Sequence, residues 1–551
     1  MKVGLIFAKI GFLRKMEVIS NEHIGLGYIA NLLKINGIEF EIIDGHFFSL
    51  GVEEMVKQIE KGKFDVLGFS VLYSNFEETI EIIDSIKKNN PSIFIYLGGQ
   101  HVSFCPEDIL LENKNIDVIM LGEGEFTTVE LIKAIENKID FSKIKGIVYR
   151  KKDKILNNGW RKPTLLIEDY GDINREILEK GLEEGLTCSI NVMAGRGCVF
   201  NCSFCTGNRI FNPYQNCSWR VRQVDTVINE LVCLIRKYNK YNNLYEIINF
   251  CDLNFVNETS KGLMWIDLFT KKLKNANLDI FFYIMTRVDS IVHQKNRIIE
   301  LRKCGLIQIE MGLEAGNDKG LSVYNKHISI KQSYDAVNFL REQRIDFGMS
   351  GFIMYHPYIK LEDLRQNAIF LKKIEYWKVM FLLTKMALYP GSEITEKVKK
   401  SELLYDTYKH YEVYDYRFED EKVELLYNAL NERLPFDLLN EISESIMYLE
   451  LQLNLIYRKI EKLVNYDNQI LDKVVKGEYS LKKEIKESKN IIFSFFMKAI
   501  ELVEVNWDIK EFDSCIARFS LEYTKKNDTI VEEYEKYSIN INKIVESIKS
   551  V

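Results

Sequence analysis

Short runs of apolar and β-branched residues alternate with longer amphipathic stretches over the first 150 residues. The six runs are residues 3–8, 40–44, 65–71, 93–97, 117–121 and 144–149. Between them, apolar residues recur at helical spacing, for example over residues 26–34 and 76–88. Apolar strands separated by helices are typical of βαβ units, so this pattern predicts a doubly wound parallel sheet with helices on both faces.

The residues at the ends of three of these predicted strands are mostly small or polar. They are Ser70, Leu72, Gly98, Gly99, Gly122 and Glu123. Ligands of doubly wound sheets bind beyond the carboxyl ends of the strands, where such residues meet. The pattern therefore predicts a binding rim at this edge of the sheet, although it does not name the ligand.

A second series of short apolar runs occupies residues 189–193, 246–251, 280–285, 306–312, 347–354 and 379–387. About six strands with intervening helices predict a partial or full β/α barrel, whose reactive groups lie at the carboxyl ends of the strands. Farther on, apolar residues recur at spacings of three and four, which predicts one face of a single long helix: Ile442, Ile446, Leu449, Leu453, Ile456 and Ile460. The predicted domains are 1–150 (sheet domain), 151–185 (linker or cap), 186–400 (barrel) and 401–551 (α-helical C-terminal domain).

The composition indicates a protein with a large core and no electrostatic attraction to nucleic acid. Of the 551 residues, 46% are apolar, and 74 basic residues face 80 acidic ones, which gives a net charge of −6. We therefore expect no nucleic-acid partner. No run approaches the roughly 18 apolar residues needed to span a bilayer, and the N-terminus lacks the apolar core of a signal peptide. We expect a cytoplasmic protein without a membrane span.

The strongest motif is a cysteine triplet, Cys198, Cys202 and Cys205, at the spacing C-x3-C-x2-C on a loop after a predicted strand. Cysteine thiolates hold iron–sulfur clusters, and a cubane with three protein ligands leaves one iron open to another ligand. A structural zinc site would need a second pair of cysteines or histidines, which the other seven cysteines do not supply. The triplet therefore predicts an iron–sulfur site.

This segment, residues 194–208, resembles the radical S-adenosylmethionine (SAM) superfamily, in which C-x3-C-x2-C binds a [4Fe–4S] cluster. The resemblance implies that SAM binds the open iron, and that the reduced cluster cleaves SAM to a 5′-deoxyadenosyl radical. It also implies an external reductant such as flavodoxin or ferredoxin. Phe204 matches the aromatic position beside the adenine, with plain core packing as the other interpretation.

Later strand ends extend the resemblance. It implies that Asp252 binds the amino group of SAM, Arg287 its carboxylate and Glu314 the ribose hydroxyls. Pro390 and Gly391 match the turn that follows the sixth strand. The Leu-Pro-Gly-Glu motif frequent at the fifth strand is replaced by residues 354–358, which makes Tyr355 and His356 candidates to face substrate.

Residues 1–150 resemble the Rossmann-like cobalamin-binding domain that is often fused to radical SAM barrels. Glycines let a backbone approach a bulky nucleotide tail, and a serine hydroxyl can bond its polar groups. The base-on motif D-x-H-x-x-G is absent, because residues 21–26 keep only its histidine. We expect cobalamin without a histidine below cobalt, with His23 as an axial ligand being the alternative. The implied cobalamin-binding residues are His23, Ser70, Leu72, Gly98, Gly99, Gly122 and Glu123.

The resemblance implies an enzyme that methylates an unactivated carbon of a small molecule or a peptide. The same architecture would also suit radical cyclisation, rearrangement or oxidation without methyl transfer. A third hypothesis is a non-catalytic sensor that holds a cluster and uses residues 401–551 for interaction. The sequence assigns no acid–base residue, and the absence of further cysteine pairs argues against auxiliary clusters.

Overall fold

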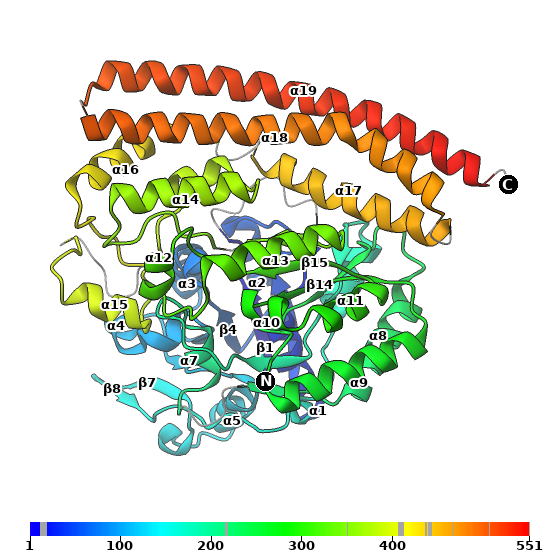
Figure 1. Ribbon diagram of the computed structural model, residues 1–551. Helices are drawn as coiled ribbons and strands as arrows, with labels where there is room; N and C mark the ends of the chain where they lie inside the picture. Colours follow the sequence, from blue (N-terminus) through cyan, green and yellow to red (C-terminus); the bar gives the residue numbers. More distant parts are fainter. Residues whose placement is uncertain are drawn as a thin grey trace. The chain divides into compact units, whose positions relative to one another are not determined.

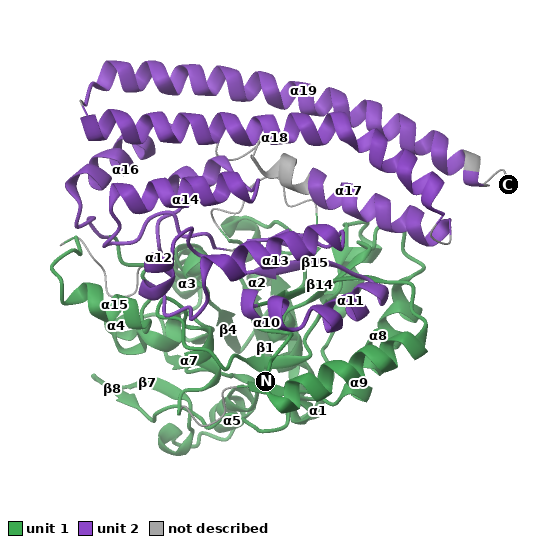
Figure 2. Cartoon of the chain, in the orientation of Figure 1, with its two compact units in different colours: residues 1–286, 387–415 green, residues 287–386, 416–551 purple. Residues whose placement is uncertain are grey.

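The computed structural model describes residues 1–10, 19–214, 219–349, 351–405, 413–435, 438, 443–464, 467–505 and 507–549. The chain divides into two compact units (Figure 2). Unit 1 comprises residues 1–286 and 387–415, and unit 2 comprises residues 287–386 and 416–551. The predicted domain boundaries at residues 150, 185 and 400 stay a prediction.

Unit 1 begins with a seven-stranded sheet in the order β3-β1-β4-β5-β6-β7-β8. The parallel strands are β1 (Lys2–Phe7), β3 (Glu39–Asp44), β4 (Val66–Ser70), β5 (Phe94–Gly98) and β6 (Val118–Met120). The helices between and after them are α1 (Ile24–Ile35), α2 (Val52–Gly62), α3 (Phe76–Asn89), α4 (Pro106–Glu112) and α5 (Glu125–Glu136). Apolar side chains from both faces of the sheet form two separate buried clusters. The predicted doubly wound sheet is confirmed.

The order of the five parallel strands creates a switch point between β1 and β4. Counted along the chain, the order is second, first, third, fourth, fifth, so the connections leave β1 and β4 in opposite directions. Such a switch opens a crevice at the carboxyl ends of the two strands. The strand order alone therefore predicts a ligand site at this edge of the sheet.

The far edge of this sheet is antiparallel. β7 (Ile147–Lys151) runs antiparallel to β6, and β8 (Lys154–Asn157) runs antiparallel to β7. The sequence predicted a strand at residues 144–149 within a parallel sheet, and that direction was wrong. Apolar patterning identifies a strand but not its direction, and antiparallel edge strands are common in doubly wound sheets.

The rest of unit 1 carries the first strands of the second series. β10 (Asn191–Val192), β13 (Ile247–Phe250) and β14 (Phe281–Thr286) are parallel neighbours. Two small pairings accompany them: β2 (Ser20–Asn21) with β9 (Cys188–Ser189), and β11 (Gly195–Gly197) with β12 (Trp219–Val221). The helices are α6 (Glu176–Glu183), α7 (Gly207–Phe211), α8 (Val224–Tyr238), α9 (Ser260–Ala276) and α15 (Glu393–Lys399).

Unit 2 continues the series with the parallel strands β15 (Leu306–Met311) and β16 (Asp346–Gly348). Its helices before residue 386 are α10 (Val288–His293), α11 (Lys295–Lys303), α12 (Asp318–Val323), α13 (Ile330–Glu342) and α14 (Leu361–Lys373). The C-terminal helices are α16 (Glu421–Arg433), α17 (Ser443–Leu463), α18 (Asn468–Val505) and α19 (Ile509–Lys549). α18 and α19 lie side by side as a long hairpin (Figure 1), which confirms the predicted helical C-terminus.

One predicted strand of the second series is absent. Residues 379–387 begin with a 3-10 helix, η5 (Val379–Leu383), followed by an isolated bridge from Lys385 to Tyr355. A short apolar run does not distinguish a strand from a buried helical turn, which is why the sequence misled here. The other 3-10 helices are η1 (Tyr73–Asn75), η2 (Val102–Phe104), η3 (Phe141–Lys143) and η4 (Ile167–Tyr170). Within the described ranges, no helix carries an apolar stretch long enough to cross a membrane.

Two adjacent glycines at the end of β5 give a matched stability test. Gly99 has φ +112°, and an added Cβ would lie 2.5 Å from the carbonyl oxygen of Val71. We expect Gly99→Ala to lower the free energy of unfolding by about 2–4 kcal/mol, since both strain and a backbone clash oppose it. At Gly98 an added Cβ would lie 3.7 Å from Cβ of Met120, an ordinary contact, so Gly98→Ala is the control. Urea denaturation followed by circular dichroism measures both, and equal midpoints would contradict this account.

Candidate functional site

A cavity of about 370 Å³ lies in unit 1 at the carboxyl end of the parallel sheet. Strands β1, β4, β5 and β6 all contribute to its wall, so it includes the switch-point crevice. Seven residues implied by the sequence to bind cobalamin all line it: His23, Ser70, Leu72, Gly98, Gly99, Gly122 and Glu123. The structure thus brings together residues that are far apart along the chain, and the largest separation is the 100 positions from His23 to Glu123.

Residues from both sides of the cysteine triplet also line the cavity, namely Met193, Arg196, Gly207, Ile210 and Phe211. Cys251 and Leu253, which follow β13, line it as well. Gly207 lies two residues after Cys205, and its backbone N–H donates a hydrogen bond to Cys205 Sγ at 3.3 Å. A ligand in this cavity would therefore lie next to the loop that carries the three cysteines.

Three buried polar atoms at the cavity lack a partner among the described residues. They are the hydroxyls of Tyr28 and Tyr96 and the Oε2 oxygen of Glu125. Buried polar atoms are normally hydrogen-bonded, so unpaired ones beside a cavity indicate a polar ligand. The amide side chains around a corrin ring would supply donors and acceptors for these atoms, and the residues present therefore fit cobalamin.

The imidazole of His23 has both nitrogens engaged within the protein. Nδ1 accepts a hydrogen bond from the backbone N–H of Leu26 at 3.1 Å, which caps helix α1. The ring proton therefore resides on Nε2, which donates to Ser70 Oγ at 2.9 Å. Burial lowers the pKa of His23 to about 4, so the ring is neutral at neutral pH. Neither nitrogen offers a lone pair to cobalt, which favours the expectation of no histidine ligand.

Glu123 is held by two arginines that the sequence analysis did not single out. Its carboxylate receives Arg196 Nη1 at 2.8 Å and Arg220 Nη2 at 2.7 Å, and the hydroxyl of Tyr170 donates to it at 3.0 Å. Burial opposes ionisation of Glu123, but the two guanidinium groups outweigh it and lower the pKa of its carboxyl. Glu123 therefore acts as an anchor for arginines at the cavity wall.

Arg196 extends this cluster to the first residue of α5, Glu125. Its Nη2 lies 2.6 Å from Glu125, and its guanidinium lies over the rings of Tyr28 and Tyr170, at 5.1 Å and 4.6 Å from their centroids. Such stacking is the geometry of cation–π attraction. Because Arg196 precedes Cys198 by two residues, this buried cluster joins the cavity rim to the start of the cysteine loop.

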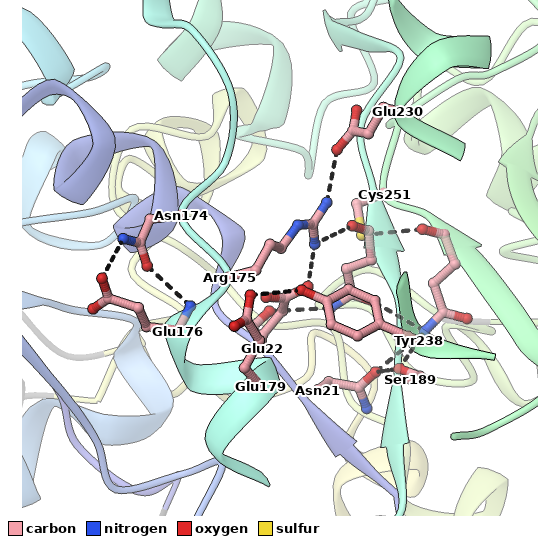
Figure 3. Close-up of polar contacts among 12 residues, drawn as sticks. Asn21, Glu22, Asn174, Arg175, Glu176, Glu179, Ser189, Glu230, Tyr238 and Cys251 are labelled. Carbon is pink, nitrogen blue, oxygen red and sulfur yellow. Dashed lines mark hydrogen bonds and ion pairs between the residues drawn. The ribbon is translucent and has the colours of Figure 1, made fainter. Parts of the chain in front are cut away.

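A second buried ion cluster fastens the loop that contains His23 (Figure 3). Arg175 pairs with Glu22, and its Nη2 lies 2.7 Å from Glu230. Nη1 of Arg175 also donates to the carbonyl of Asn191 in β10 at 2.8 Å, and the Asn191 amide donates to the carbonyl of Glu22 at 3.0 Å. The strand-end loop is thus bound to the first strand of the second series.

The three cysteines lie between β11 and α7 as half-buried thiols. The loop is held by hydrogen bonds from Cys205 N–H to the carbonyl of Cys202 (3.1 Å) and from Ile394 N–H to that of Ser203 (3.0 Å). Within the described ranges, no three His, Cys, Asp or Glu side chains lie close enough together to hold a metal ion, and this includes the three cysteines of the loop. Three thiol donors fit a cluster with one open iron. Cys217 lies outside the described residues.

Phe204 and Asp252, two of the residues implied to contact SAM, also belong to unit 1. Phe204 is half-buried on the cysteine loop itself. Asp252 follows β13, is buried, and accepts a hydrogen bond from the backbone N–H of Ala194 at 2.9 Å. Burial raises the pKa of Asp252 to about 7. A cationic group beside it would stabilise its carboxylate.

Arg287 and Glu314, the other two such residues, belong to unit 2 and share a buried network. Arg287 forms a two-point contact with Asp289, at 2.9 Å and 3.1 Å, and donates to the carbonyl of Lys326 at 2.6 Å. The amine of Lys326 lies 2.8 Å from Glu314, whose φ of +63° is unusual for a non-glycine residue. Lys326 therefore links the two predicted residues.

Tyr355 and His356, the candidates near the predicted fifth strand, are both buried. The Tyr355 ring packs against Phe418 and Tyr427. His356 Nδ1 accepts a hydrogen bond from the backbone N–H of Tyr358 at 3.2 Å. Both side chains therefore belong to the core of unit 2.

Two segments of the chain match family models. Residues 20–132 match the B12 binding domain, and residues 192–371 match the radical SAM superfamily. The chain belongs to the cobalamin-dependent radical SAM family. The cofactors of this radical SAM enzyme are accordingly a [4Fe–4S] cluster, SAM and cobalamin.

Relatives of this radical SAM enzyme differ in the reactions for which they are named. It is 27% identical over 386 residues to an uncharacterized methyltransferase, PH0819, of Pyrococcus horikoshii. This match covers 69% of this chain and 79% of that protein. It is also 27% identical over 332 residues to the anaerobic magnesium-protoporphyrin IX monomethyl ester cyclase of Rubrivivax gelatinosus, covering 58% of this chain and 56% of the cyclase. The chain thus matches about half the length of the cyclase.

The fold of the enzyme is that of a solved relative. The structure of the cobalamin-dependent S-adenosylmethionine radical enzyme OxsB, with aqua-cobalamin and S-adenosylmethionine bound, superposes with a TM-score of 0.70 at 17% identity. The match covers 99% of this chain and 84% of OxsB. This likeness establishes the architecture, including the helical C-terminus.

Replacing Glu123 by Gln removes the counter-charge of two buried arginines. We expect a loss of about 3 kcal/mol in the free energy of unfolding, because a buried ion without its partner is costly. The control is Glu130→Gln, whose partner Arg161 is partly exposed, with an expected loss below about 1 kcal/mol. The pKa of Glu123 is lowered in the folded state, so its stabilisation is fully present above its ordinary pKa of 4.5 and is lost as the pH falls from there through the lower pKa of the folded state. Equal losses in both variants at pH 7 would contradict this account.

The hydrogen bonds of His23 predict the electron paramagnetic resonance (EPR) spectrum of the enzyme loaded with Co(II) cobalamin. Because both ring nitrogens are used by Leu26 and Ser70, we expect no nitrogen splitting from histidine. The measurement compares protein labelled with ¹⁵N-histidine with unlabelled protein, and His23→Gln is the control. A change of splitting on labelling that disappears in the variant would show that His23 is the axial ligand.

Proposed function

We propose that this enzyme transfers a methyl group to an unactivated carbon of a small molecule or a peptide. One observation carries the proposal: a single cavity of unit 1 is walled by the strand ends of the B12-binding segment and by residues next to Cys205. A methyl carrier and a radical source must act on the same carbon, so their sites have to adjoin. The cavity satisfies that requirement.

The cofactors would supply the radical and the methyl group, and the chain would supply their placement. Cys198, Cys202 and Cys205 would hold the cluster. Ser70 would bind cobalamin, because its oxygen accepts from His23 while its own hydrogen stays available to donate. Gly99 would let the ligand approach the backbone, since its φ of +112° and its contact with Val71 leave no room for a side chain.

The residues implied to contact SAM would bind its charged groups and its ribose. Asp252, a buried carboxyl whose pKa is raised to about 7 by burial, would accept the ammonium group. Arg287 would bind the carboxylate, and Glu314, held by Lys326, would accept hydrogen bonds from the ribose hydroxyls. In this proposal residues 1–150 bind cobalamin, residues 186–400 bind the cluster and SAM, and residues 401–551 shape access for the substrate.

A radical reaction without methyl transfer is the second candidate. It is favoured by one observation, because the methyltransferase of Pyrococcus horikoshii and the cyclase of Rubrivivax gelatinosus match this chain at the same 27% identity. Either reaction needs an electron from an external reductant. Flavodoxin or ferredoxin would serve, since both deliver single electrons at low potential.

The products formed from SAM distinguish the two reactions. The purified enzyme, reconstituted with iron, sulfide and cobalamin, is incubated anaerobically with SAM, reductant and candidate substrates. We expect both 5′-deoxyadenosine and S-adenosylhomocysteine by mass spectrometry, because methylation consumes one SAM for the radical and one for the methyl group. Cys202→Ala should lose 5′-deoxyadenosine by at least about 100-fold, since the cluster then lacks a ligand.

Cys233→Ala is the matched control, because this exposed thiol on α8 lies outside the triplet. It should keep the products of the unmodified enzyme. Formation of 5′-deoxyadenosine without S-adenosylhomocysteine would overturn methyl transfer and favour the second candidate. Equal loss of 5′-deoxyadenosine in both cysteine variants would contradict the assignment of the cluster ligands.

A further inference from the structure

The cavity of unit 1 continues below its rim into a deep end to which the proposed function assigns no role. Leu5, Gly68 and Tyr96 line it, and each lies two residues before the last residue of its strand. Leu5 of β1 pairs in register with Gly68 of β4, and Gly68 pairs with Tyr96 of β5, so the three residues form a row across the sheet. At about 3.3 Å per residue, this row lies about 7 Å below the strand ends.

Helices α1 and α5, labelled in Figure 1, form the facing wall of the deep end. Helices that follow parallel strands run back along the sheet from its carboxyl edge. Ile29 lies five residues after the start of α1 and Thr128 three residues after the start of α5, and both line the cavity. The deep end therefore lies between the sheet and these helices. All five of its residues named here are uncharged, so it suits a narrow, neutral group.

The side chain of Tyr96 spreads over β4 at the position of Gly68. A Cβ added at Gly68 would lie 2.0 Å from Cζ of Tyr96 and 2.2 Å from its hydroxyl oxygen. Because Gly68 has no side chain, the ring can occupy the space above the neighbouring strand. Any other residue at position 68 would displace the ring, so the two residues together set the depth of the cavity.

The hydroxyl of Tyr96 is buried and has no hydrogen-bond partner among the described residues. Burial raises the pKa of Tyr96 more than the neighbouring Thr128 lowers it, so the hydroxyl keeps its proton at neutral pH and can donate. Thr128 itself donates to Met120 Sδ at 3.5 Å. Buried hydroxyls are normally paired, so an unpaired one in the wall of a cavity indicates an acceptor atom on the ligand.

Only one part of cobalamin has a shape that suits this space. The corrin ring carries amide side chains around its edge and is too broad to enter between a sheet and the helices packed on it. The nucleotide tail is a single chain that ends in a flat, neutral benzimidazole base. One nitrogen of this base binds cobalt in free cobalamin, and its lone pair becomes an acceptor when the base leaves cobalt. Tyr96 offers the matching donor.

We propose that the nucleotide base of cobalamin occupies the deep end, detached from cobalt, and that Tyr96 donates a hydrogen bond to the nitrogen thus freed. The inference rests on the proposed binding of cobalamin in this cavity, and it adds a residue that determines specificity. Cobamides share the corrin ring but differ in this base. Tyr96 favours those whose base has an acceptor nitrogen, because a base without one leaves the buried hydroxyl unpaired.

Binding to the reconstituted full-length enzyme, measured by isothermal titration calorimetry, tests this pairing. The probes are cobalamin, p-cresolylcobamide, whose base contains no nitrogen, and cobinamide, which lacks the nucleotide. We expect the unmodified enzyme to bind cobalamin about tenfold more tightly than p-cresolylcobamide, which is the effect of one buried hydrogen bond. Tyr96→Phe should bind cobalamin about tenfold more weakly, lose the preference over p-cresolylcobamide, and keep the Kd for cobinamide.

Tyr149→Phe is the matched control. Tyr149 is a buried tyrosine of β7 whose hydroxyl also has no partner among the described residues, but it is not one of the residues that line the cavity. This variant should keep the Kd of the unmodified enzyme for all three probes. Circular dichroism checks the fold of both variants, which we expect to be unchanged because each loses only an unpaired buried hydroxyl.

An unchanged Kd for cobalamin in Tyr96→Phe, or equal weakening of cobalamin and cobinamide, would overturn this inference and leave cobalamin binding itself intact. So would nitrogen splitting in the EPR spectrum of the Co(II) form that does not respond to ¹⁵N-histidine, because it would show the base still bound to cobalt. If none of the probes binds the unmodified enzyme, the proposed cobalamin site fails as well. Methyl transfer is judged separately, from the products of SAM.

Discussion

The architecture of unit 1 depends on a buried ion cluster in which Arg196 and Arg220 meet Glu123. Charges of this kind are costly to remove from water, and the cost is recovered only when each group finds its partners in good geometry. Glu123 belongs to the loop after β6, while the two arginines flank the cysteine loop on β11 and β12. A displacement between these segments would leave charges buried without partners. The cluster therefore fixes the distance between the cavity rim and the cysteine loop.

The polar atoms at the rim of the cavity determine which ligands it suits. Its rim is built from backbone turns and small side chains, and polar atoms of Tyr28 and Glu125 remain unpaired beside it. The ion clusters at Glu123 and at Arg175 pair the buried arginines around it with carboxylates, so the polar atoms left unpaired at the cavity are available to a ligand. The protein thus offers directed hydrogen bonds rather than net charge, which suits a large ligand with many amide groups.

Much of this could be predicted from the sequence because parallel strands end at a common edge. Seven residues chosen from strand ends and from one loop line a single cavity, since chain order and strand direction suffice to bring them there. The arginines could not be found in this way. Arg175 and Glu22 are 153 positions apart, and no periodic pattern relates residues at such separation. Arg196 gave the one available signal, because it lies within the glycine-flanked segment before Cys198.

The errors of the sequence analysis have equally physical causes. The direction of β7 depends on the connection after α5, which apolar spacing does not encode. Residues 379–383 form a 3-10 helix although their composition suits a strand, because burial favours apolar residues in either conformation. The role of Glu123 shows a related effect. Its position at a strand end placed it at the cavity, yet its carboxylate is used by Arg196 and Arg220.

The ion cluster also sets an order of events during synthesis. Arg220 follows Glu123 by 97 residues, so a ribosome needs about 5–20 s to deliver it. In that interval the first sheet can form, but Glu123 stays exposed to water and the cavity has only one wall. If the cavity holds cobalamin as proposed, the nascent chain would complete that site only after the cysteine loop has emerged. The 97 residues between Glu123 and Arg220 would then set the delay.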